Sequence, residues 1–155
     1  ARDFKITPQQ LEAAITPRTR VVVINSPSNP SGIAYSPGEL RALCDVIERH
    51  SNVSVFSDEI YEKLVYGGLE FASVAAVKPE LYDRTLTFNC HSKSFAMTGW
   101  RLGYVAGPKP VIDAINKLQS QMSSHVTSFI QLPGAIALSD PRGAQSVEQM
   151  RVQFE

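Results

Sequence analysis

The sequence contains few of the features that mark specialised classes of protein. It has two cysteines in 155 residues, Cys44 and Cys90, and their wide separation gives neither a disulfide framework nor the spacing of a metal site. No apolar stretch is long enough to span a bilayer, and the first residues do not form a signal peptide. We therefore expect a cytoplasmic protein without a metal, in which Cys44 is a small buried thiol.

An excess of charge of either sign is also absent. Lys and Arg number 15 and Asp and Glu number 15, so nothing indicates the basic surface that nucleic acid or an anionic membrane would require. A content of 43% hydrophobic and 19% charged residues is typical of a globular domain and excludes disorder throughout. A small, roughly neutral ligand is the expected partner.

Alternating helix and strand signals predict an α/β layered fold. Capping boxes at Thr7–Gln10 and Ser36–Glu39 each open a helix, and the second helix is amphipathic and ends near residues 50–52. A long amphipathic helix is predicted after Pro108. The first strand candidate is a β-branched run, typical of a strand buried on both faces. The strand candidates are residues 21–25, 53–58, 85–90 and 103–107.

Unusual polar residues stand at the carboxyl ends of the predicted strands. Asn29 lies past the first strand, Asp58 closes the second, and Lys93 lies past the third. Ligands of parallel α/β sheets collect at this edge, so one pocket could hold all three side chains. Lys93 precedes Arg101 by eight residues, which places an amine that can bind a carbonyl near a guanidinium that can hold a phosphate.

Four motifs in a fixed order resemble those of class I aminotransferases, which are fold-type-I enzymes that use pyridoxal 5'-phosphate (PLP). They are the Asn-Pro-Ser-Gly turn at 29–32, the Asp58-x-x-Tyr61 pair, Ser92-Lys93, and the Ala-Met-Thr-Gly-Trp-Arg segment at 96–101. The last segment looks most like bacterial-type aspartate or aromatic aminotransferases. The resemblance covers nearly the entire chain.

The resemblance implies a role for each motif residue. Lys93 would carry the cofactor aldehyde as an imine and, once released, move the substrate α-proton. Asp58 would keep the pyridine nitrogen protonated. The other residues would bind two oxygen groups of the cofactor, with Asn29 and Tyr61 at the phenolic oxygen and Ser92 and Arg101 at the phosphate.

Some neighbours of these residues have no role in that scheme. Glu59 is predicted to be a bystander, because its side chain should leave the strand end in a different direction from Asp58. His91 and His125 are predicted to be packed or solvated. Cys90 stands where many relatives have a phosphate-binding serine and others a glycine, so its contribution stays open. The family also implies a cis peptide bond before Pro30.

The resemblance implies the three-layer large domain of PLP-dependent transferases in incomplete form, with three parallel strands and then an antiparallel one, contiguous in the sheet. Residues 1–138 would be the central part of this PLP-binding domain, and 139–155 the linker and the truncated start of a small domain. Whole enzymes of the family are more than twice this length. We therefore expect an internal fragment of a homodimeric protein, inactive alone.

The implied reaction transfers an amino group from an L-amino acid, aspartate-like or aromatic, to a 2-oxo acid. One alternative is another fold-type-I PLP enzyme, a C–S lyase or decarboxylase, because residues outside this segment largely set the reaction type. A second is the PLP-sensing domain of a transcriptional regulator. The neutral charge and the absence of a visible DNA-binding module favour an enzyme.

Overall fold

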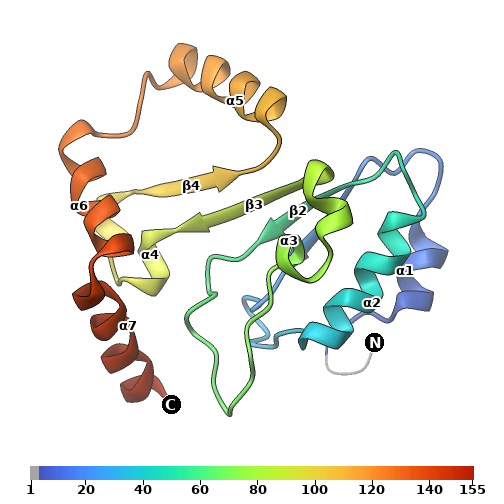
Figure 1. The fold of residues 1–155 in the computed structure, drawn as a ribbon, viewed down its shortest axis with the longest axis horizontal. Coiled ribbons are helices and arrows are strands. Elements are labelled where there is room, and N and C mark those ends of the chain that lie inside the picture. Colours follow the sequence, from blue (N-terminus) through green and yellow to red (C-terminus); the bar gives the residue numbers. More distant parts are fainter. Residues whose placement is uncertain (1–3) are drawn as a thin grey trace.

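The computed structural model describes residues 4–155, which contain one four-stranded sheet (Figure 1). Its strands lie in the order β1 (Val21–Asn25), β2 (Ser54–Asp58), β3 (Thr85–Cys90) and β4 (Gly103–Ala106). The pairs β1–β2 and β2–β3 are parallel, whereas β4 runs antiparallel to β3. The expected mixed sheet with contiguous strands is confirmed.

Both predicted capping boxes are present, so each helix start is stabilised by reciprocal hydrogen bonds between a side chain and the backbone. The one-turn helices were not predicted, since they are too short to carry a periodic apolar pattern. In the described part of the chain, no helix is both long and apolar enough to cross a membrane. The helices are α1 (Pro8–Ala14), α2 (Pro37–Glu48), α3 (Val74–Val77), η1 (Pro79–Arg84), α4 (His91–Ser94), η2 (Thr98–Trp100), α5 (Lys109–Met122), α6 (Ser128–Ser139) and α7 (Pro141–Phe154).

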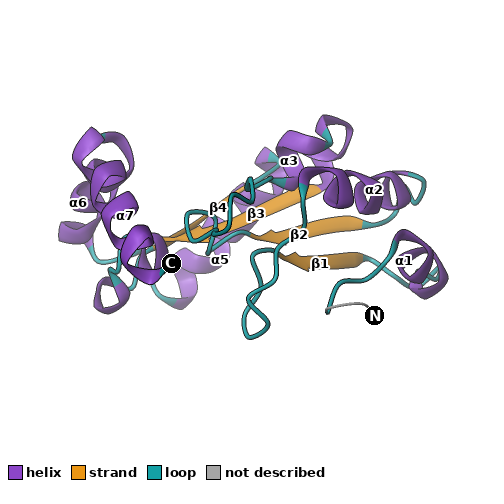
Figure 2. Cartoon of the chain, turned by 90° about the horizontal axis from the view of Figure 1, so that it is seen from below, coloured by secondary structure: helices purple, strands orange, loops and turns teal. Residues whose placement is uncertain are grey.

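The main core lies between β1–β2 and the helices α2 and α3, which cover the same face of the sheet (Figure 2). Side chains alternate along a strand, so Ile24 and Val55 point toward these helices, where both are buried. The apolar side chains along one face of α2 pack against Ile24 and Val55 and exclude water from the core. The buried members of this core are Leu11, Ile24, Leu40, Leu43, Cys44, Val46, Ile47, Val53, Val55, Val74 and Leu81.

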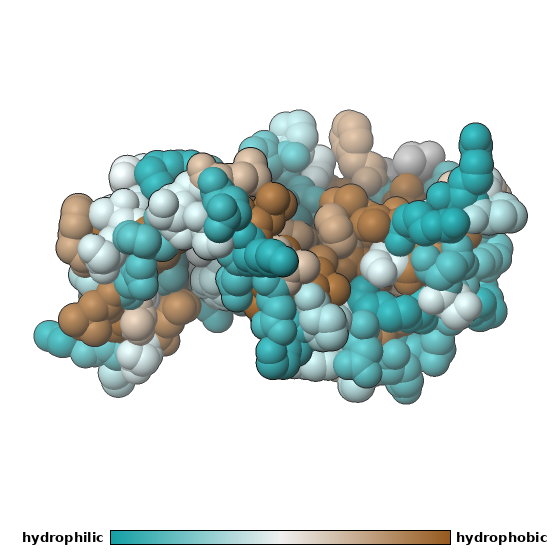
Figure 3. Space-filling view, turned by 90° about the horizontal axis from the view of Figure 1, so that it is seen from above, coloured by the Kyte–Doolittle hydropathy of each residue, from teal (hydrophilic) through white to brown (hydrophobic). Residues whose placement is uncertain are grey.

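The opposite face of the sheet is open at β1, so the prediction that this strand is buried on both faces is wrong. Val23 is 67% exposed, and Val21 on the same face is also exposed. The physical reason is that the helices packed on β1 meet only the side chains that alternate toward them. On the neighbouring strands, the rings of Phe56 and Phe88 pack together with centroids 5.3 Å apart. Apolar residues also reach the surface in the middle of the molecule (Figure 3).

The last helices are packed more loosely than α2. The amphipathic helix predicted after Pro108 is present as α5, but none of its residues is buried. Helix α6 ends and helix α7 begins at Asp140, which lies within the predicted boundary segment. The division into domains at residue 138 stays a prediction.

Truncation of the core should cost far more stability than truncation of the loosely packed helix. We expect Leu43→Ala, at a side chain that is 1% exposed, to lower the free energy of unfolding by about 3 kcal/mol. The same change at Leu118, which is 61% exposed on α5, should cost less than about 0.5 kcal/mol. Equilibrium urea unfolding measures both values, and equal losses would contradict the placement of the core.

Candidate active site

The turn after β1 is fixed to the end of β2 by the side chain of Asn25. Its Oδ1 accepts a hydrogen bond from the Asn29 backbone at 3.2 Å, and its Nδ2 donates to the Asp58 carbonyl at 3.4 Å. The peptide bonds before Pro27 and Pro30 are both cis, and the second confirms the expectation from the motif. Sequence reasoning missed the role of Asn25, although a polar residue that closes an apolar strand was a usable signal.

The turn and the loop after β2 meet at Asn29 and Tyr61. The Asn29 amide donates to the Tyr61 hydroxyl at 3.2 Å, although the two residues are 32 apart in the sequence. An amide carries two hydrogens and a hydroxyl carries one, so each group keeps a hydrogen that it can donate to a third oxygen. Both residues line an open hollow of about 340 Å³, together with Pro27, Ser28, Pro30, Gly32, Leu64 and Tyr66.

Lys93 lies beside this pair. Its Nζ is 5.6 Å from the centroid of the Tyr61 ring, within the range of a cation–π contact. The residue belongs to the one-turn helix α4, which follows β3 directly, and its side chain is half-buried. Within residues 4–155 it forms no ion pair. The structure therefore places both Lys93 and Asn29 beside Tyr61.

Asp58 closes β2 and stands in register with Asn25 on β1 and Phe88 on β3. Its carboxylate accepts one long hydrogen bond, 3.4 Å, from the backbone of Ile60. The side chain is half-buried, and in the described part of the chain it has no cationic partner. Asp58 therefore retains acceptor capacity at the edge of the sheet where Asn29 and Lys93 lie.

Among residues 4–155, the side chains of the two predicted phosphate ligands form no hydrogen bond with this cluster. Arg101 follows η2 in a left-handed conformation, φ 53°, and its exposed guanidinium donates to the Thr98 carbonyl at 3.0 Å. Among residues 4–155 it has no carboxylate partner, and Ser92 forms no side-chain hydrogen bond. Arg101 lines a second hollow of about 430 Å³ with Ala96, Gly99, Trp100, Thr127, Phe129 and Ile130.

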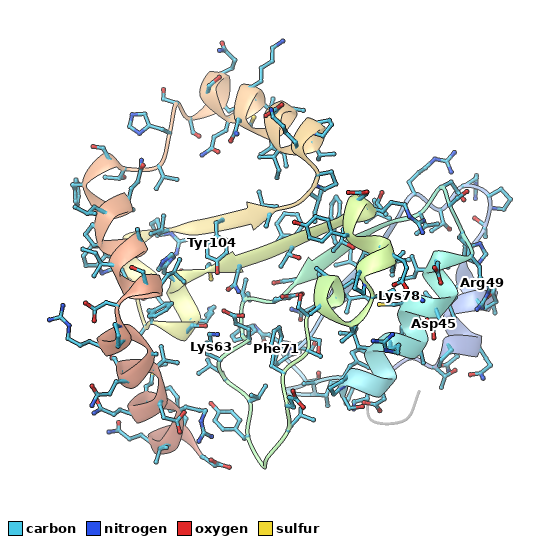
Figure 4. All side chains as sticks on the ribbon, in the orientation of Figure 1. Asp45, Arg49, Lys63, Phe71, Lys78 and Tyr104 are labelled. Atoms are coloured by element: carbon cyan, nitrogen blue, oxygen red, sulfur yellow. The ribbon has the colours of Figure 1, made fainter. Side chains whose placement is uncertain are left out.

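His91 is packed, as predicted, and fastens the helix turn that carries Lys93. The imidazole is 2% exposed, lies against Tyr104 (labelled in Figure 4), and its Nε2 is 2.9 Å from the Gly134 carbonyl on α6. A Cβ at Gly134 would overlap the end of the Leu102 side chain, which would have to shift to admit a larger residue at this close approach of α6. His125 is exposed.

The family model for aminotransferase class I and II matches residues 1–155. The chain belongs to this family. The chain is 52% identical over 139 residues to the aspartate/prephenate aminotransferase of Cereibacter sphaeroides, and it is 53% identical over 152 residues to the aspartate aminotransferase of Geobacillus stearothermophilus. These alignments cover 90% and 98% of this chain, but only 35% and 38% of the relatives. The chain thus spans little more than a third of the length of these relatives.

Solved structures of aminotransferases share the fold. The aspartate aminotransferase of Rhizobium meliloti superposes with a TM-score of 0.92 at 46% identity, covering 97% of this chain and 37% of that one. An aromatic aminotransferase from Pyrococcus horikoshii gives 0.93 at 38% identity, covering 98% and 40%. The similarity confirms the expected family and fold class. The roles of the individual site residues stay predictions.

The two cysteines of this aminotransferase segment should differ in reactivity. Burial raises the pKa of the Cys44 thiol to about 12, so at pH 8 only about one thiol in ten thousand is the reactive thiolate. Cys90 is half-buried at the end of β3. We expect iodoacetamide to modify Cys90 in the folded protein and to spare Cys44, and peptide mass spectrometry measures this. Denatured protein, in which both should react, is the control, and equal rates in the folded state would contradict the buried placement.

Proposed function

We propose that the chain is the central part of the cofactor-binding domain of a PLP-dependent aminotransferase. Residues 1–138 would belong to the large domain, and residues 139–155 would lead into the small one. The observation that carries the proposal is the hydrogen bond from Asn29 to Tyr61 beside the Lys93 amine, at the sheet edge that Asp58 closes. Membership of the class I and II family supports it.

PLP, when bound, supplies an electron sink for the carbanion that forms when an amino acid loses its α-proton. The donor set fits this cofactor group by group. An amine, a carboxylate, a pair of neutral donors and a guanidinium match its aldehyde, pyridine nitrogen, phenolic oxygen and phosphate. Among residues 4–155, the charged members Lys93, Asp58 and Arg101 have no ion-pair partners, so their charges are available to a ligand.

Lys93 would bind the cofactor through its amine and then, displaced by the substrate, move the proton at the substrate α-carbon. A lysine amine suits both steps, because its nitrogen lone pair can attack a carbonyl carbon and can also accept a proton. The Tyr61 ring beside Nζ limits where the amine can go. The half-buried position on α4 therefore matches a group that must be both reactive and confined.

The other residues would hold the ring and the phosphate in place. Asn29 and Tyr61 each keep a hydrogen to donate to the phenolic oxygen, and the Asp58 carboxylate would stabilise a proton on the pyridine nitrogen. Arg101 would bind phosphate oxygens through its planar guanidinium, and Ser92 would add a hydroxyl. Together these contacts would fix both ends of the cofactor.

The proposed reaction moves an amino group from an L-amino acid to a 2-oxo acid. The substrates would be aspartate-like or aromatic, since relatives of this chain are described as aspartate, aspartate/prephenate and aromatic aminotransferases. We also propose a cytoplasmic location and a homodimer for the full-length protein. Their support is the family alone.

The assignment of Lys93 is tested by reductive trapping. We expect borohydride treatment of the full-length protein with PLP to label the peptide that contains Lys93, because reduction makes the bond between amine and cofactor permanent. Lys93→Ala should abolish the label, whereas Lys63→Ala, which removes an exposed amine from the loop after Tyr61, should leave it unchanged. Label at any other lysine, found by peptide mapping, would refute the assignment.

The role of Arg101 is tested by the affinity for PLP. We expect Arg101→Ala to raise the Kd of the full-length protein for PLP about 10- to 100-fold, the effect of losing about 1.5–3 kcal/mol of charge-assisted hydrogen bonds. Arg142→Ala is the matched control, because that guanidinium is exposed and paired with Asp140. Fluorescence titration measures both, and equal Kd values for Arg101→Ala and the unmodified protein would contradict the phosphate role.

A further inference from the structure

Glu59 carries a buried carboxyl group within the Asp58-x-x-Tyr61 motif of the candidate site. It lies between Asp58 and Tyr61 in the sequence and is only 4% exposed. Its side chain points to the face of the sheet that the helices cover, away from the face of Asp58, because successive side chains alternate. The predicted divergence of the two carboxyls is therefore confirmed, but the contacts of Glu59 are not those of a bystander.

Three hydrogen bonds converge on one oxygen of this carboxyl group. Its Oε1 accepts from the Ser57 hydroxyl at 2.7 Å, from the Ser73 hydroxyl at 2.8 Å and from the backbone N–H of Val74 at 3.3 Å. Ser57 belongs to β2, whereas Ser73 and Val74 begin α3. A buried carboxyl group without such donors would be costly, so its position is closely determined.

These contacts close the loop that carries Tyr61. Glu59 begins the loop of residues 59–73 and Ser73 ends it, so one carboxyl group joins its two ends 14 residues apart. The Glu59 backbone N–H also donates to the Phe88 carbonyl on β3 at 3.0 Å. Figure 4 labels Lys63 and Phe71 on the two sides of this loop. Tyr61 thus lies two residues after Glu59, which is hydrogen-bonded to β2, to β3 and to the start of α3.

The burial of the Glu59 carboxyl group disfavours its charged form. Burial raises the pKa of Glu59, against the opposing effect of the hydrogen bonds from Ser57 and Ser73, and the nearby Glu62 carboxylate raises it further. Within the described residues, Glu59 has no cationic partner that would offset its burial. Because burial of this carboxyl group is costly, we infer that its main contribution is to fix the position of the loop ends and not to stabilise the fold.

We propose that Glu59 is a positioning residue, which holds the base of the 59–73 loop so that the Tyr61 hydroxyl stays against Asn29 and aims at the phenolic oxygen of the cofactor. The inference rests on the proposed function, since it needs PLP in the site. Glu59 touches neither Tyr61 nor Asn29 directly. It acts through the backbone of the loop that it closes.

The test is the pH midpoint of the visible absorption band of PLP bound to the full-length protein. A donor to the phenolic oxygen stabilises its negative charge and so lowers the proton affinity of the nitrogen that joins lysine and cofactor. Tyr61→Phe removes that donor and should raise the midpoint by about one pH unit. Glu59→Ala should raise it by a part of that shift, whereas Glu59→Gln, whose amide oxygen still accepts the three hydrogen bonds, should change it little.

A double mutant separates positioning from general destabilisation. If Glu59 acts through Tyr61, then Glu59→Ala should add almost nothing to the midpoint in the Tyr61→Phe background, since coupled sites are not additive. Glu70→Gln, an exposed carboxylate of the same loop, is the matched control and should leave the midpoint unchanged. Should Glu59→Ala fail to fold, Ser73→Ala removes one of the three hydrogen bonds and should give a smaller shift with the same dependence on Tyr61.

The outcomes distinguish this inference from the proposed function. An unmodified protein that develops no visible band with PLP would overturn the proposed function. A band that titrates normally, with a midpoint unmoved by Glu59→Ala and Ser73→Ala, or moved equally with and without the Tyr61 hydroxyl, would overturn the positioning role alone. A shift that disappears in the Tyr61→Phe background supports it.

Discussion

The parallel register of the first three strands is the constraint on which the candidate site depends. Asn25, Asp58 and Phe88 are neighbours across β1, β2 and β3, so these strands place their carboxyl ends along one edge. Each following segment then starts from a fixed point on that edge. Residues as distant in sequence as Asn29, Tyr61 and Lys93 meet there because the sheet, and not the loops, sets their starting positions.

Precision within the site comes from side chains that do not belong to it. Asn25 fastens the turn that carries Asn29, Glu59 closes the loop that carries Tyr61, and His91 docks the helix turn that carries Lys93 onto α6. Each of these contacts joins a reactive segment to a strand or helix nearby. A cofactor site needs such support, because a displacement of even 1 Å in a catalytic group lowers the rate strongly.

Packing is uneven across the molecule, and the candidate site lies between a tightly packed region and a loosely packed one. The β1–β2 sheet and α2 form a dry core, whereas α5 buries no residue and one face of β1 is exposed. Asn29 and Tyr61 belong to segments that leave the well-packed strands. Arg101 precedes β4 and lines a hollow partly formed by α6. The two proposed ends of the cofactor site are thus supported by different parts of the fold.

The sequence by itself determined what depends on near neighbours. Capping boxes predicted the starts of α1 and α2, a β-branched run predicted β1, and the short motifs that hold Asn29, Asp58, Tyr61 and Lys93 indicated the family. These signals are local, because a cap or a turn is decided by residues three or four positions apart. Only the tertiary structure decided that one face of β1 is open, that Arg101 lines a separate hollow, and that Asn25 and Glu59 hold the loops. Such features depend on hydrogen bonds and packing between segments 14 to 33 residues apart, whose partners no local pattern specifies.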